Sequence, residues 1–160
     1  MSYVYELDAE LTDVFVDNQG TSVVEFALGY DLDAEEIVLF SVALGPSVDG
    51  ASDLRFGVRT RHAVKEWMIS GLDFSREVVL ECIPPAGRPV VRELLLTAIS
   101  RLAEKCPDDK ITMETYYQNL PPKALEKYND IAKSLEMLGF FTERKFRDED
   151  GYDYWLFSKN

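Results

Sequence analysis

The order of hydrophobic patterns between Glu77 and Lys159 is the feature that most constrains the fold of this chain. An apolar run at 78–83 predicts a strand, and a proline-rich loop follows it. Pro89 then suits the first turn of an amphipathic helix, because a helix does not use the backbone N–H that proline lacks there. This stretch therefore predicts a strand, a loop and a helix in succession.

The last forty residues predict a second helix and a hairpin. The helix begins at Pro121 or Pro122 and ends before Gly139, which suits the left-handed position after a helix. The turn at 148–151 (Asp-Glu-Asp-Gly) separates two β-prone runs, as in a hairpin.

The segment from Lys110 to Asn119 decides between two folds. As a strand it lines up Ile111, Met113, Thr115 and Tyr117, and its β-prone residues favour this form. The strand predicts the α/β class, with a mixed central β-sheet of six or seven strands and at least two packed helices. As a helix, the segment instead predicts a β-rich N-terminal domain followed by a C-terminal winged helix.

The first 83 residues read mainly as strands, at 3–16, 23–28, 37–44 and 54–60, with a short helix over 61–70. We expect one domain over 1–160, with an acidic β-rich half (1–83) and an α/β half (84–160).

The N-terminal third is strongly acidic. Residues 1–53 hold twelve carboxylates and no lysine or arginine, and the whole chain has a net charge of −12. Such a charge repels a phosphate backbone, so we expect no direct binding of nucleic acid. It attracts a basic protein surface, and the candidate partner-binding residues are Asp8, Glu10, Asp13 and Asp17.

A basic cluster follows this acidic third abruptly. Arg55, Arg59 and Arg61 alternate along one predicted strand and therefore share a face, with His62 beside them. Two interpretations stay open: the arginines bind an anionic ligand, or they pair with carboxylates of the N-terminal sheet.

Other functional classes find little support in the sequence. The chain has no apolar run of about 18 residues and no signal-peptide pattern, so we expect a cytoplasmic protein without a membrane span. Cys82 and Cys106 suggest reduced thiols, and we expect no metal site.

With 110–119 as a strand, residues 77–160 resemble the C-terminal half of the GNAT acetyltransferase superfamily. The residues that carry the resemblance are the loop and helix start at 88–95 (Arg-Pro-Val-Val-Arg-Glu-Leu-Leu), Asn119, the Leu138-Gly139-Phe140 end of the second helix, Trp155 and Lys159.

The resemblance implies a site for acetyl-CoA or CoA. Backbone amides at the helix start would hold the pyrophosphate, which places cofactor binding at Gly87, Arg88, Val90, Val91 and Arg92.

Two residues are catalytic candidates for this chemistry: Glu81 by its place in the predicted strand at 78–83, and Tyr128 by the resemblance. Glu81 would act as general base, although a strand carboxylate facing solvent is the alternative, and Tyr128 would act as acid where the family's tyrosine aligns with Leu135.

Two functions remain. The first is a small acidic, non-catalytic interaction or inhibitor protein on a GNAT-like scaffold that binds a basic protein surface, as a phage-type antagonist or nucleic-acid mimic does. The alternative is an acetyl-CoA-dependent N-acyltransferase.

Overall fold

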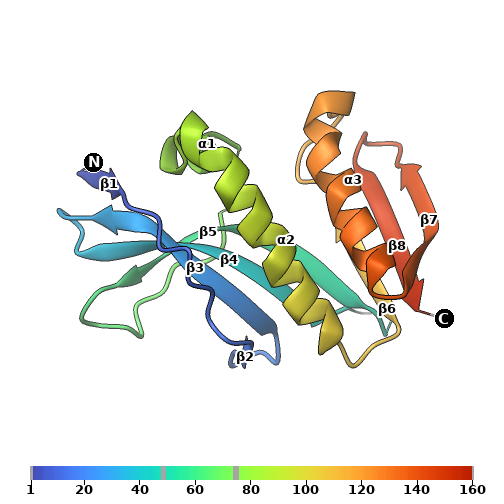
Figure 1. Ribbon diagram of the computed structural model, residues 1–160, viewed down its shortest axis with the longest axis horizontal. Helices are drawn as coiled ribbons and strands as arrows, with labels where there is room; N and C mark the ends of the chain where they lie inside the picture. Colours follow the sequence, from blue (N-terminus) through green and yellow to red (C-terminus); the bar gives the residue numbers. More distant parts are fainter. Residues whose placement is uncertain (1, 48–49, 74–75, 160) are drawn as a thin grey trace.

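The described residues of this α+β protein form eight strands and three α-helices. The computed structural model describes residues 2–47, 50–73 and 76–159, and Figure 1 shows its arrangement. The strands are β1 (Tyr3–Tyr5), β2 (Phe15–Val16), β3 (Ser22–Asp31), β4 (Glu36–Pro46), β5 (Ser52–His62), β6 (Lys110–Glu114), β7 (Phe140–Arg147) and β8 (Asp153–Lys159). The helices are α1 (Arg76–Cys82), α2 (Arg88–Glu104) and α3 (Pro122–Met137), with a 3-10 turn at Pro85–Gly87.

The strands form one sheet in the order β1-β3-β4-β5-β6-β8-β7, and β2 pairs with β3 outside that path. All neighbours are antiparallel except β5 and β6, which run parallel over only three residue pairs, from Ser52 with Ile111 to Leu54 with Met113. Beyond that point β6 ends and β5 continues, so an edge of β5 is left without a strand partner. The sheet takes strands from both halves of the sequence.

The core lies between the sheet and the helices. Alternate residues of β3, β4 and β5 point to α2, which crosses this part of the sheet, while α3 covers β8 and β7 (Figure 1). Trp155 is 1% exposed and stacks on Tyr128, with ring centroids 5.5 Å apart. No helix in the described ranges is long and apolar enough to cross a membrane.

The segment that decides the fold is a strand. Residues 110–114 form β6 with Ile111 and Met113 fully buried, and residues 115–120 are not helical. The winged-helix alternative, which needs a helix at 113–120, is therefore wrong. The strands predicted at 23–28, 37–44 and 54–60, both main helices and the hairpin are confirmed, and Gly139 has the expected positive φ of 92°.

Three other local predictions are wrong. The run at 78–83 is helical, because its inward residues Val78, Val79, Cys82 and Ile83 recur four apart, as on one side of a helix. The expected helix over 61–70 is a loop that returns along β5. The long first strand also breaks: between Tyr5 and Phe15 the chain follows β3 irregularly through single hydrogen bonds, such as Glu6 N–H to the Leu28 carbonyl (2.9 Å).

Candidate functional site

The start of α2, where the pyrophosphate site was predicted, has few free amides. The N–H groups of Gly87 and Arg88 donate to the Pro84 and Pro85 carbonyls, and the next residue, Pro89, has no N–H. The Tyr5 phenol also covers this helix end, since a Cβ added at Gly87 would collide with it. The helix start therefore offers an anion little of the usual backbone cradle.

The side chains predicted to bind the cofactor have other contacts. Arg88 donates through Nε to the Ile83 carbonyl (3.3 Å), and Arg92 pairs with Asp130 of α3. Val91 is 5% exposed and packs in the core, whereas Val90 is exposed. Arg88, Val91 and Arg92 thus connect α2 to its neighbours. Of the five residues predicted to bind the cofactor, Arg88 and Val90 are the exposed ones.

The two catalytic candidates lie on different helices, and only Tyr128 lines a cavity. Glu81 is an exposed residue of α1, not of a strand. Tyr128 is buried on α3, and this burial raises the pKa of its phenol to about 12. Leu135, which takes the family position of the tyrosine, is fully buried in the core.

The cavity beside Tyr128 opens where β5 and β6 diverge. It holds about 240 Å³, mostly apolar, between α1, β5 and α3, and Tyr116 and Lys127 also line it. Burial, and next the Asp53 carboxylate, raise the pKa of Tyr116. Tyr116 was not predictable as a site residue, because its exposure to this cavity depends on β6 ending at Glu114.

Where β6 ends, the loop segment 68–73 pairs with the edge of β5 through isolated backbone bridges. Asp73 and Val58 exchange two backbone hydrogen bonds (2.7 and 3.0 Å), and Ser70 N–H donates to the Thr60 carbonyl (2.9 Å). An extended ligand therefore cannot add to this edge unless the 68–73 segment leaves it.

The arginine cluster lies on the face of the sheet opposite the helices. Glu25, 3% exposed, accepts hydrogen bonds from the Ser41 hydroxyl (2.7 Å) and from Arg59 (2.7 Å from Nη2). Arg61 Nη1 lies 3.6 Å from the same carboxylate, and Arg55 pairs with Asp53 at 2.7 Å. Pairing with the N-terminal sheet, one of the two interpretations, is therefore observed.

Glu25 was missed as a key residue, although the sequence holds a signal for it. It is the single charged residue in the apolar stretch Val23–Leu28, where burial of a carboxylate needs a partner.

Three of the four acidic candidates lie on the segment between β1 and β2, and the fourth, Asp17, follows β2. Asp8, Glu10 and Asp13 are exposed, and they line a shallow hollow of about 350 Å³. The Asp8 carboxylate accepts one local backbone N–H, from Glu10 (3.0 Å), whereas that of Asp17 accepts two, from Gln19 and Thr21 (2.8 and 3.0 Å), and so shapes the turn before β3.

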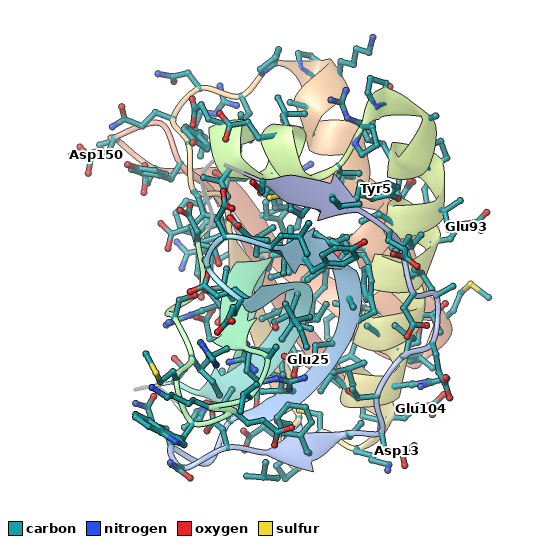
Figure 2. The ribbon with its side chains drawn as sticks, turned by 90° about the vertical axis from the view of Figure 1, so that its left-hand side faces the viewer. Tyr5, Asp13, Glu25, Glu93, Glu104 and Asp150 are labelled. Carbon is teal, nitrogen blue, oxygen red and sulfur yellow. The ribbon has the colours of Figure 1, made fainter. Side chains whose placement is uncertain are left out.

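Helix α2 extends this acidic surface. Arg101 donates to the Thr12 carbonyl (3.3 Å) and holds the segment against the helix. Asp13 and the exposed Glu93 and Glu104 of α2 lie on the same side of the molecule in Figure 2. We call Asp8, Glu10, Asp13, Glu93 and Glu104 the acidic ridge. Within residues 2–47, 50–73 and 76–159, no cationic side chain forms an ion pair with any of them.

Comparison of the chain with protein-family models, with curated proteins and with solved structures finds no match.

Proposed function

We propose that this protein acts by binding: its acidic ridge contacts a basic surface of another protein, and the complex inhibits or occupies that partner. The observation that carries the proposal is the ridge itself. Its five carboxylates are exposed, and no cationic side chain in the described ranges forms an ion pair with them.

The ridge is also held in place, which lowers the cost of binding. Thr12 N–H donates to the Glu25 carbonyl (3.0 Å), and the Thr12 hydroxyl accepts from Glu25 N–H (3.1 Å). Arg101 then connects the segment to α2. Because the segment is tied to β3 and to a helix, less conformational entropy is lost when a partner orders it.

Charge favours a basic partner over a neutral one. A net charge of −12 accelerates encounter with a positive surface, and carboxylates in series along an extended segment present charge as a nucleic-acid strand does. A basic groove that normally accepts nucleic acid is therefore a suitable partner surface, as for a phage-type antagonist.

The scaffold that we propose is GNAT-like. The support is the parallel pair β5–β6 connected through α2, followed by α3 and a hairpin, within an otherwise antiparallel sheet. The strand that precedes α2 in this arrangement is β5 rather than 78–83, with α1 inserted between them.

Acyl transfer from acetyl-CoA to an amine is the second candidate. The cavity at the divergence of β5 and β6, with the Tyr116 and Tyr128 rings in its wall, supports it. Three observations weigh against it: the covered start of α2, the occupied edge of β5, and a Tyr128 phenol whose pKa near 12 makes it a weak proton donor at neutral pH.

Two experiments separate the candidates. Immobilised protein should capture a basic partner from lysate. The amount retained should fall steeply between about 50 and 500 mM salt, because salt screens the attraction between exposed charges. Capture that persists unchanged at high salt would contradict the role of the ridge. Calorimetric titration with acetyl-CoA and with CoA tests the alternative, because heat that saturates would favour the enzyme and its absence at millimolar ligand would retire it.

A further inference from the structure

A polar cavity lies on the helix-free face of the sheet, away from the cavity beside Tyr128. It holds about 450 Å³, and its walls include Arg55 and Arg59 of β5, Ser41 of β4 and the turn before β3. This volume lies within the range of small-molecule sites, roughly 300 to 1,000 Å³.

The carboxylates in and beside this cavity already have partners. Glu25 accepts from Ser41 and Arg59, and Asp17 accepts from two backbone amides of its own turn. Asp53 accepts from the Thr112 hydroxyl (2.9 Å) through one oxygen and from Arg55 Nε (2.7 Å) through the other. Asp17 takes both of its hydrogen bonds through Oδ1, so within the described residues its Oδ2 is the main acceptor that these contacts leave to a cationic ligand.

Guanidinium donors, in contrast, are in excess. Three arginines face three carboxylates here, Glu25, Asp53 and Asp17, so the cluster carries no net charge, but its guanidinium groups keep N–H donors that the ion pairs do not use. Arg55 uses only Nε, and Arg59 uses Nε and Nη2, within the described ranges. Arg61 Nε also has no hydrogen-bond partner among the described residues, but it is buried and Arg61 does not line the cavity, so the donors open to a ligand are those of Arg55 and Arg59.

We infer that this cavity binds a small molecule through an anionic group, a carboxylate or a phosphate. Arg55 and Arg59 supply charge-assisted hydrogen bonds, and the Thr21 hydroxyl and Gln19 amide complete the polar wall. The acidic ridge does not prevent this, because charges on the surface are screened over about 8 Å at physiological salt.

The test is a ¹H–¹⁵N NMR titration of the whole chain with inorganic phosphate and, separately, with malonate, at ionic strength held constant with sodium chloride. We expect saturable shifts at residues 17–23, 41–45 and 53–59. Saturation by phosphate alone, by malonate alone or by both supports the site and identifies the anionic group that it prefers. Shifts that stay linear for both, or that chloride alone reproduces, would overturn the inference.

A pair of variants with equal charge makes the test specific. Arg55→Gln removes a donor whose side chain is 58% exposed, so the fold should persist, and the affinity should fall about tenfold or more. Arg144→Gln makes the same change in net charge on the exposed face of β7 and should leave the affinity unchanged. Equal weakening in both variants would show attraction by overall charge and would overturn the site.

Discussion

Substitution of Glu25 by glutamine tests how the arginines stabilise the sheet. Glutamine keeps the shape of the side chain, so no cavity forms, but Arg59 and Arg61 lose their shared counter-charge. Their side chains are 15% and 32% exposed and that of Glu25 is 4% exposed, so the pairs are largely shielded from water. Removing one partner of a buried pair costs about 3 to 5 kcal/mol of folding free energy. Because Arg61 is partly exposed, we expect a loss of about 3 kcal/mol.

The measurements are urea unfolding, which gives the free energy, and thermal unfolding, which gives the melting temperature, both at pH 7 and followed by circular dichroism. For a chain of 160 residues, a loss of that size lowers the melting temperature by roughly 6 to 12 °C. The control is Asp130→Asn, which breaks the pair with Arg92, where both side chains are more than one third exposed, and which should cost at most about 1 kcal/mol. If Glu25→Gln costs no more than Asp130→Asn, the buried cluster does not stabilise the sheet as argued.

Three further predictions concern single side chains. Burial raises the pKa of Tyr128 to about 12, so the unfolded chain ionises first, and the free energy of unfolding should fall by roughly 2 kcal/mol between pH 10 and 12. Tyr128→Phe should remove that part of the decline in alkaline urea titrations, and an unchanged slope would argue against burial as the cause. Gly139→Ala should cost about 1 to 2 kcal/mol in urea unfolding, because φ is 92° there while open space surrounds the added methyl group; a neutral result would mean that the turn relaxes. Trp67 is 79% exposed and Trp155 is 1% exposed, so Trp67→Phe should remove most acrylamide quenching of the fluorescence; strong residual quenching would place Trp155 near solvent.

Much of the fold follows from the sequence because periodicity reports burial. The β6 strand was predictable from the alternation of Ile111 and Met113, and the end of α3 from Gly139. The helix at 76–82 was not, because a six-residue apolar run suits a buried strand as well as a short helix. Only packing against the sheet distinguishes the two.

The candidate site was less predictable, for a physical reason. Whether a carboxylate has a hydrogen-bond or ion-pair partner depends on contacts with residues that are distant in the sequence. Asp8, Glu10 and Asp13 could be predicted from the absence of nearby cations, but the role of Asp17 in its own turn depends on the backbone conformation there. The pairing of Glu25 with Arg59, 34 residues later, depends on strand register that the sequence alone leaves open.

One comparison tests the central claim most directly: the affinity of the captured partner for two variants of equal net charge. The ridge variant carries Asp8→Asn, Glu10→Gln and Asp13→Asn, and the control variant carries Glu126→Gln, Glu149→Gln and Asp150→Asn, three exposed carboxylates on α3 and in the β7–β8 turn. Asp17 is left intact because it shapes a turn.

Calorimetry at physiological salt should show at least about a tenfold weaker complex for the ridge variant, roughly 1.4 kcal/mol, and little change for the control variant. Equal affinities for the two variants would contradict the assignment of partner binding to the acidic ridge.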